Sequence, residues 1–384
     1  MSNQIYKNIY LDNAATTQMA EAVEEAMQPY LRENFGNAST IYSYGEEAKE
    51  AIEHARKIIA DSLEANPSEI YFTSGGSESD NWALKGIAGA CKHKGKHIIT
   101  SKIEHHAVLN SCEYLLRLGY EITYLDVDER GIVSPEAVMD AIRADTILIS
   151  IMFGNNEIGT IEPIMQIGRI AREHQILFHT DAVQAYAQVP ISVKHYPVDL
   201  LSASAHKFHG PKGVGFLYVR EGIQIPSFIH GGSQEQGKRA GTENVPGIVG
   251  MGKAVELAFA DMRRRIQRET MLRNYLIERV MHEIPDVRIN GHRVQRLPGN
   301  VSISFRGIDG ASLLILLEED GICASGGSAC NTGEERISYV IKEIRVPDDY
   351  AAGTIRMSLC GNTTRQDIDT VVKSLKCNVK KLRG

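Results

Sequence analysis

The chain has 384 residues, which is long enough for two or three domains and for a core that needs neither disulfides nor a structural metal. Hydrophobic residues make up 43% of it and charged residues 23%, so a disordered or fibrous chain is excluded. With 42 basic and 48 acidic side chains the net charge is −6, which argues against partners such as nucleic acid or an anionic membrane.

The six cysteines form no C-x-x-C pair, so neither a zinc ribbon nor a thioredoxin-like site is indicated. The N-terminal sequence MSNQIYKNIYLDN lacks the apolar stretch of a secretory signal. The longest aliphatic run, LLILL at 313–317, is too short to cross a bilayer. We therefore expect a cytoplasmic protein with reduced thiols and no membrane association.

Seven short apolar runs that are typical of strands alternate with helical patterns in the first two-thirds of the chain. They are EIYFTS (69–74), HIITS (97–101), EITYLDV (121–127), TILISIMF (146–153), ILFH (176–179), DLLSAS (199–204) and VGFLYV (214–219). Several lack polar alternation, as expected of parallel strands that are covered on both faces. The alternation predicts an α/β domain with a mostly parallel seven-stranded sheet.

Helical signals lie between and after these strands. Segment 46–63 places small and aliphatic residues on one face, and Ser134-Pro135 is a cap followed by proline at the first helical position. One long charged helix is predicted over 247–283, followed by short strands at 300–305 and 354–359 that are interleaved with helices. We therefore expect a large domain at 15–255 and a smaller α+β domain formed by 1–14 and 256–384.

Polar residues follow five of the predicted strands at their carboxyl ends, which is where open α/β sheets bind ligands. Gly75-Gly76-Ser77-Glu78 follows the strand at 69–74 and opens a helix, whose first N–H groups suit a phosphate. The groups that follow the other four strands are, in chain order, His105, Asn156, Asp181 with Gln184, and His206 with Lys207. Because all of them fall at one edge of the sheet, the sequence predicts a single site.

This combination matches the needs of pyridoxal phosphate. The cofactor requires a lysine that binds its aldehyde, a carboxylate that keeps the pyridine nitrogen protonated, and a ring that stacks on its own. Hydroxyls such as those of Ser77 and Ser204 suit its phosphate. Taken singly, Lys207, Asp181 and His105 would be interpreted as a solvated lysine, a helix cap and a surface histidine. The prediction of a pyridoxal phosphate site therefore depends on the placement of all three residues at one edge of the sheet.

Two further patterns resemble ligand sites without completing them. His206 and His209 have a metal-like spacing, but no third carboxylate or cysteine completes a site, so no metal is predicted. The segment 232–239 nearly fits a P-loop, but Arg239 stands where the magnesium-binding hydroxyl is required. A nucleotide triphosphatase is therefore not indicated.

Ten sequence motifs lie along almost the whole chain. They are YLDNAATT (10–17), NFGNAS (34–39), FTSGGSESDN (72–81), EHHAV (104–108), NNEIGT (155–160), HTDAVQ (179–184), SAHKFHGPKGVG (204–215), RAGTEN (239–244), SGGSAC (325–330) and IRMSL (355–359). Taken together, they resemble the class I cysteine desulfurases of the NifS/IscS type, which are class-V aminotransferase-like, fold-type I pyridoxal phosphate enzymes. The lysine, RAGTEN and SGGSAC motifs in this order are the most specific part of the resemblance.

The resemblance implies roles for the candidate cofactor site. Lys207 resembles the Schiff-base lysine, and Asp181 the partner of the pyridine nitrogen. His105 resembles the ring-stacking residue that also moves protons, and Gln184 the partner of the phenolic oxygen. The implied cofactor-binding set is Gly76, Ser77, His105, Asn156, Asp181, Gln184, Ser204, His206, Lys207 and Thr242.

The resemblance also implies the substrate, the partners and the reaction. Asn156 and Arg356 are expected to bind L-cysteine, with Arg356 gripping its carboxylate in a bidentate fork. Thr242 is expected to reach the phosphate of the neighbouring subunit, which implies a homodimer. Sulfur is expected to pass from L-cysteine to Cys330, leaving L-alanine and a persulfide. An acceptor such as an iron–sulfur scaffold protein would then take the sulfur.

Alternatives stay open at this point. Small residues surround Cys330 and indicate a mobile loop, whereas Cys323 lies in an apolar, strand-like stretch that is typical of a buried structural cysteine. A selenocysteine lyase or an aminotransferase of the same fold would use the same cofactor, and a non-catalytic regulatory or scaffold protein would keep the fold alone. The segment 331–333 departs from the usual pattern and leaves the identity of the sulfur acceptor open, and Tyr42 stands where many members of this family carry histidine.

Overall fold

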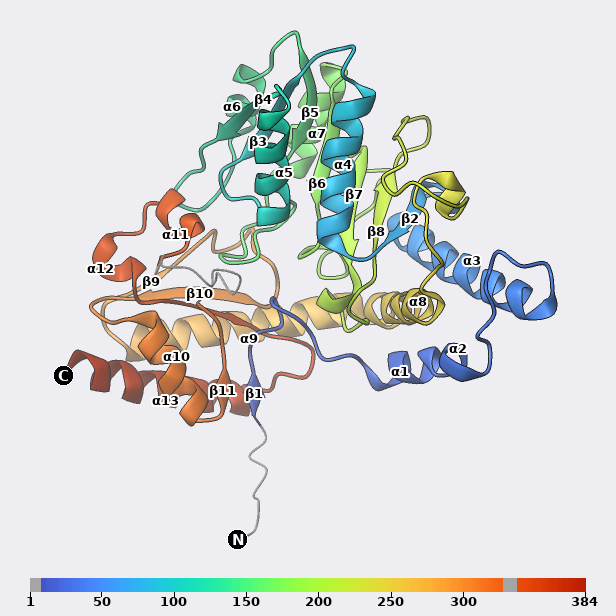
Figure 1. Ribbon diagram of the computed structural model, residues 1–384. Helices are drawn as coiled ribbons and strands as arrows, with labels where there is room; N and C mark the ends of the chain where they lie inside the picture. The colour runs from blue at the N-terminus through green and yellow to red at the C-terminus, as the bar shows by residue number, and fades with distance from the viewer. Residues whose placement is uncertain (1–7, 327–336) are drawn as a thin grey trace.

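The computed structural model describes residues 8–326 and 337–384. Its largest sheet has seven strands in the order β2-β8-β7-β6-β5-β3-β4 (Figure 1). The strands are β2 (Ile70–Thr73), β3 (His97–Ser101), β4 (Glu121–Leu125), β5 (Thr146–Ser150), β6 (Leu177–Asp181), β7 (Leu200–Ser204) and β8 (Gly215–Val219). β8 is antiparallel to both of its neighbours and all other pairs are parallel. The prediction of a mostly parallel seven-stranded sheet is confirmed.

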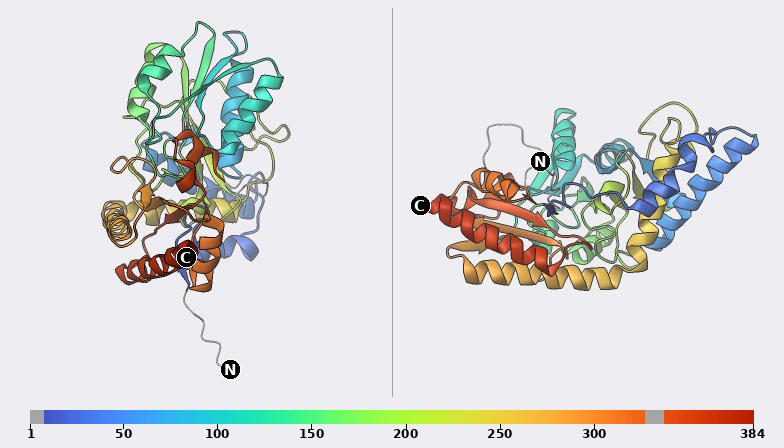
Figure 2. Two further views of the ribbon diagram at one scale, coloured as in Figure 1. Left: turned by 90° about the vertical axis from the view of Figure 1, so that its left-hand side faces the viewer. Right: turned by 90° about the horizontal axis from the view of Figure 1, so that it is seen from below.

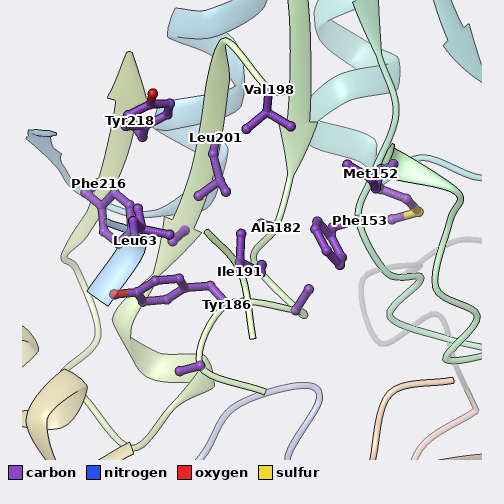
Figure 3. Packing of buried hydrophobic residues seen from close by; sticks show 14 of the residues in the cluster. Leu63, Met152, Phe153, Ala182, Tyr186, Ile191, Val198, Leu201, Phe216 and Tyr218 are labelled. Atoms are coloured by element: carbon purple, nitrogen blue, oxygen red, sulfur yellow. The ribbon is translucent and has the colours of Figure 1, made fainter. Parts of the chain in front are cut away.

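Helices cover both faces of this sheet. Those of the first 260 residues are α1 (Glu21–Met27), α2 (Pro29–Arg32), α3 (Ser43–Leu63), α4 (Gly76–Ala90), α5 (His106–Arg117), α6 (Pro135–Asp140), α7 (Ile164–Glu173) and α8 (Val245–Ala260), with short 3₁₀ turns at Pro67–Glu69, Ala205–Lys207 and Glu235–Gly237. The side chain of Ser134 caps α6, as predicted. Tyr186 packs edge-on against Phe216 and Phe208 in the core of one face, beside Leu63 of α3 (Figure 3).

The rest of the chain builds two small sheets, ordered β12-β10-β9 and β1-β11. Their strands are β1 (Ile9–Tyr10), β9 (Val287–Ile289), β10 (Asn300–Phe305), β11 (Ile322–Cys323) and β12 (Thr354–Ser358), and their helices are α9 (Met262–Glu283), α10 (Gly310–Glu319), α11 (Tyr339–Glu343), α12 (Asp348–Ala351) and α13 (Arg365–Arg383). α9 and α13 lie side by side (Figure 2). Leu276 and Val280 of α9 belong to one core with Ile368 and Val372 of α13.

One predicted element is wrong: the long helix expected over 247–283 is two helices. α8 ends and α9 begins at Asp261, whose φ of −127° and ψ of 21° are not helical. α8 packs against α1 and α3, whereas α9 packs against α13, so the break redirects the chain between two cores. The domain boundaries at 15 and 255 stay a prediction. Across the part of the chain that the structure describes, no helix is both long and apolar enough to cross a membrane.

Candidate active site

The carboxyl ends of the strands surround a cavity of about 360 Å³. Every predicted cofactor residue except Thr242 lines it, and so does Arg356. Among the residues that the structure describes, the lining consists of Ala14, Ala15, Gly76, Ser77, Asp80, His105, His106, Met152, Gly154, Asn156, Glu157, Asp181, Val183, Gln184, Ser204, His206, Lys207, Tyr339 and Arg356. The sequence therefore predicted which side chains come together, because they follow parallel strands that end at one edge.

Lys207 lies in the 3₁₀ turn that follows β7. Its Nζ donates hydrogen bonds to the backbone carbonyl oxygens of Ala14 at 2.7 Å and of Ala15 at 2.8 Å. Gln184 Nε2 donates to the same Ala14 oxygen at 2.9 Å. An N-terminal segment therefore forms one wall of the cavity and holds the lysine amine inside it.

Asp181 ends β6 at the floor of the cavity and is 6% exposed. Its Oδ1 accepts a hydrogen bond from the backbone N–H of Val183 at 2.9 Å. Burial raises the pKa of this carboxyl, while the charges of His105 and Lys207 oppose the increase. A cation bound against Asp181 would offset the cost of burying its charge. This environment fits the protonated ring nitrogen of pyridoxal phosphate.

His105 caps the N-terminus of α5, where its Nδ1 accepts a hydrogen bond from the backbone N–H of Ala107 at 3.1 Å. Burial lowers the pKa of the imidazole, so the ring is neutral at pH 7 and carries its proton on Nε2. A neutral ring can stack on an aromatic cofactor and still donate one hydrogen bond.

The opposite end of the cavity has the features of a phosphate site. The 15-residue helix α4 begins there at Gly76, after Gly75 with φ of 147°. A Cβ on Gly76 would lie 2.4 Å from Cγ2 of Val183, so this wall has no room for a side chain. Burial lowers the pKa of His206 to about 4, with the charges of Lys207 and Lys212 acting in the same direction. Helix N–H groups and a neutral imidazole thus face this end as hydrogen-bond partners.

Arg356 lies in the middle of β12 and is 2% exposed. Its Nη1 donates to the carbonyl oxygen of Asn156 at 3.1 Å, and its Nη2 donates to Asp12 Oδ1 at 2.7 Å. The side-chain Oδ1 of Asn156 is buried and finds no hydrogen-bond partner among the described residues. An arginine fork beside an unsatisfied amide suits a ligand that carries both a carboxylate and a polar group.

The two described segments that flank residues 327–336 are both tied to this cavity. Ser325 pairs with Arg356 through two backbone hydrogen bonds. Ser338 Oγ donates to Glu157 Oε2 at 2.5 Å, and the hydroxyl of Tyr339 donates to the carbonyl oxygen of Glu104. Cys330 and its expected mobile loop lie outside the described residues. Cys323 lies in β11, as the strand-like pattern predicted, but it is only partly buried.

Some residues fall outside the sequence prediction. Thr242 is exposed and, among the described residues, is not part of the cavity lining, so its role in a neighbouring subunit stays a prediction. Ala14, Ala15, Asp80 and Glu157 line the cavity without having been assigned a role. The YLDNAATT motif was the only available signal for the two alanines, which contribute backbone oxygens. The described residues hold no cluster of ligands suited to a metal ion.

Comparison with known proteins defines the class of this fold and site. A family model described as "Aminotransferase class-V" matches residues 9–371, and the chain belongs to this family. It is 55% identical to "Cysteine desulfurase IscS" of Methanosarcina thermophila, over 98% of this chain and 93% of that protein. It is 53% identical to the protein of the same name from Dictyoglomus turgidum, over 98% of this chain and 96% of the relative.

Solved structures agree with this relationship. A "NIFS-LIKE PROTEIN" matches with a TM-score of 0.92 and 39% identity, covering 98% of this chain and all of that one. A structure described as "SspA in complex with cysteine" matches with a TM-score of 0.82 and 38% identity, covering 93% of this chain and 100% of that one. The resemblance to NifS/IscS proteins that the motifs indicated is confirmed.

Proposed function

We propose that this protein is a cysteine desulfurase that uses pyridoxal phosphate to take sulfur from L-cysteine, with L-alanine as the second product. One observation carries the proposal: Lys207, Asp181 and Arg356 line a single cavity in a chain that is 55% identical to a cysteine desulfurase. These three side chains supply an amine, a buried anion and a carboxylate-binding fork, which an amino acid and this cofactor together require.

The cofactor would lie between the floor and the helix end of the cavity. Asp181 would pair with its ring nitrogen, His105 would stack on the ring, and Gln184 would bind the phenolic oxygen. The phosphate would be held by Gly76, Ser77, Ser204 and His206, with Thr242 of the neighbouring subunit of a homodimer. When bound, pyridoxal phosphate withdraws electrons from the carbon next to the substrate amine.

The protein's own groups would then orient the substrate and move its proton. Arg356 and Asn156 would fix the carboxylate of L-cysteine, which presents the Cα–H bond in one direction. Lys207 Nζ, which the carbonyls of Ala14 and Ala15 hold inside the cavity, would accept the Cα proton. The Nε2 proton of the neutral His105 would be available to a developing negative charge.

Cys330 would receive the sulfur. Its Sγ would form a bond with the substrate sulfur as the carbon–sulfur bond breaks, and a proton would complete the methyl group of L-alanine. Atoms and electrons balance without an external oxidant. The attachment of Ser325 to the Arg356 strand supports this role.

The proposal extends to the fate of the sulfur and to the compartment. The persulfide on Cys330 would be passed to an acceptor protein, such as an iron–sulfur scaffold, in the cytoplasm. Neither nucleic acid nor a membrane is expected as a partner, because the chain carries a net charge of −6.

Two substitutions test the proposal with L-cysteine as substrate. The purified parent protein should be yellow and release L-alanine, whereas Lys207→Ala should lose turnover. Cys330→Ala should keep the colour and lose persulfide formation, while Cys377→Ala, on the exposed face of α13, should behave like the parent. Sulfur transfer at the parental rate by Cys330→Ala would contradict the role of this thiol. A keto acid product would instead indicate an aminotransferase, and a strong preference for selenocysteine would indicate a lyase.

A further inference from the structure

Asp12 forms an ion pair with the cavity arginine from outside the cavity. Arg356 Nη2 and Asp12 Oδ1 are 2.7 Å apart, and the side chain of Arg356 is 3% exposed while that of Asp12 is 18% exposed. Among the described residues, Arg356 lines the cavity and Asp12 does not. Asp12 therefore contacts the guanidinium without being part of the described cavity lining.

The backbone around Arg356 is fixed, but this alone does not fix its side chain. β12 pairs Arg356 with Ser302 of β10, and Ser325 pairs with it on the other side. An arginine side chain keeps several rotatable bonds beyond its Cα, so a fixed backbone leaves the plane of the guanidinium undetermined. The hydrogen bonds to Asp12 and to the carbonyl of Asn156 supply two fixed points for that plane.

Asp12 is itself held firmly enough to serve as such a point. Ser358, two residues after Arg356, donates its N–H to the carbonyl of Leu11 at 2.6 Å. Asn13 Nδ2 donates to the carbonyl of Ser358 at 2.8 Å, and the N–H of Ala14 donates to Ser358 Oγ at 2.8 Å. These bonds fix the backbone on both sides of Asp12 to the strand that carries Arg356.

The other acid near this arginine is engaged elsewhere. Glu157 is 3% exposed, and its Oε2 accepts a hydrogen bond from Ser338 Oγ at 2.5 Å. Burial raises the pKa of Glu157, which favours its neutral form. Asp12 is therefore the carboxylate that the geometry matches to the guanidinium.

We propose that Asp12 is a positioning residue for carboxylate recognition: it fixes the plane of the Arg356 guanidinium so that the fork is presented to the substrate carboxylate. The inference rests on the proposed function, because it takes Arg356 as the group that binds the substrate carboxylate. Asp12 touches neither substrate nor cofactor. Its effect should therefore depend on whether the ligand carries a carboxylate.

Two amines that differ in one group provide the test. L-alanine and ethylamine share the same carbon–nitrogen unit, and only L-alanine has the carboxylate. Each would be titrated into the holoenzyme and followed by the absorbance of the bound cofactor. Asp12→Ala should raise the dissociation constant of L-alanine about tenfold or more, because the guanidinium loses one of the contacts that fix its plane, and change that of ethylamine less than about twofold. Equal changes for both ligands, or no change, would overturn the inference.

A double-mutant cycle provides the second readout. In an Arg356→Ala background, the substitution Asp12→Ala should change L-alanine binding less than about twofold, because Asp12 acts only through the arginine. A full additional loss in that background would overturn the inference. Asp12→Glu serves where the alanine variant does not fold, since its longer side chain shifts the guanidinium and should also weaken L-alanine selectively. A parent enzyme that responds to neither amine would instead overturn the proposed function itself.

Discussion

Two further buried carboxyl groups, those of Asp80 and Glu104, lie near Asp181. Asp80 and Glu104 are 1% and 0% exposed, and burial raises the pKa of both carboxyls, with the charge of Asp181 acting in the same direction. Glu104 Oε1 accepts hydrogen bonds from Ser101 Oγ at 2.6 Å and from the N–H of Met152 at 3.0 Å. These bonds do not offset burial, which raises the pKa of Glu104 to about 8. Glu104 is therefore mostly neutral at pH 7 and adds little negative charge beside Asp181.

The raised pKa of Glu104 predicts how stability depends on pH. Its value of about 8 in the folded chain exceeds the ordinary value of 4.5, so the folded state binds more protons between these pH values. The contribution of Glu104 to the free energy of unfolding therefore falls as pH rises from 5 to 8. Glu104→Gln keeps the acceptor oxygen and cannot ionise. The free energy of unfolding of Glu104→Gln, minus that of the parent, should increase by about 3 kcal/mol between pH 5 and pH 8. Urea unfolding of both proteins at each pH measures this difference.

The control for this prediction is Glu50→Gln, on the exposed face of α3. This side chain is exposed, so its replacement shows the effect of removing one acidic side chain from the surface. If the difference between Glu104→Gln and the parent does not change with pH, the buried carboxyl already ionises near its ordinary pKa.

Helix α4 contains two glycines, Gly76 and Gly89, whose surroundings differ. Gly76 begins the helix at the cavity, where a Cβ would lie 2.4 Å from Val183 Cγ2. Val183 also donates its N–H to Asp181 Oδ1, so a clash there disturbs both ends of the cofactor site. Gly89 lies near the other end of α4 and is exposed, and a Cβ added to it would meet no other atom within 4 Å among the described residues.

The two glycines should therefore respond to the same substitution in opposite ways. Gly76→Ala should weaken retention of pyridoxal phosphate by about tenfold, because small displacements at a preorganised site are costly. Gly89→Ala should raise the free energy of unfolding by about 0.5 kcal/mol, because alanine is the better helix former. Dialysis against buffer followed by absorbance measures the first effect, and urea unfolding measures the second. Cofactor loss from Gly89→Ala would show that the effect of Gly76 is not local.

The elements that the sequence predicted share a physical cause, and so do those it missed. Six of the seven strands of the large sheet are almost entirely buried, so each of these is a recognisable run of apolar residues, whereas the edge strand β4 buries only Leu125. β1 and β11 are two residues long and exist only because they pair with each other across the chain. The break at Asp261 follows from packing against two different cores, which local periodicity does not report.

In the candidate site, too, some residues could be predicted from local sequence patterns, whereas others depend on contacts between distant segments. Lys207, Asp181 and His105 could be found because side chains at strand ends converge in any parallel sheet. The role of the Ala14 and Ala15 carbonyls could not be predicted in this way. Backbone oxygens have no signature in the sequence, and these two residues lie far from Lys207 along the chain. The roles assigned to Cys330 and Thr242 stay predictions.

Large apolar side chains are exposed in one segment of the molecule. Phe35, Ile41 and Tyr42 are 70%, 94% and 58% exposed within the segment that joins α2 to α3. Exposed apolar side chains that form a contiguous patch are typical of interfaces. Thr242 is also exposed and lies outside the described lining of its own chain's cavity. A homodimer would give both features a function.

A mixed dimer tests whether Thr242 serves the neighbouring site. One chain would carry Lys207→Ala with Thr242 intact, and the other would carry Thr242→Ala with Lys207 intact, each with a different purification tag. If Thr242 acts across the interface, one of the two sites regains a complete set of residues, and the mixed dimer should show about half of the parental activity and one site of parental cofactor affinity. If it acts within its own chain, activity should not exceed half of that of the Thr242→Ala homodimer. Lys207→Ala paired with Arg356→Ala is the matched control, because Lys207 and Arg356 line the cavity of the same chain and no complete site can form.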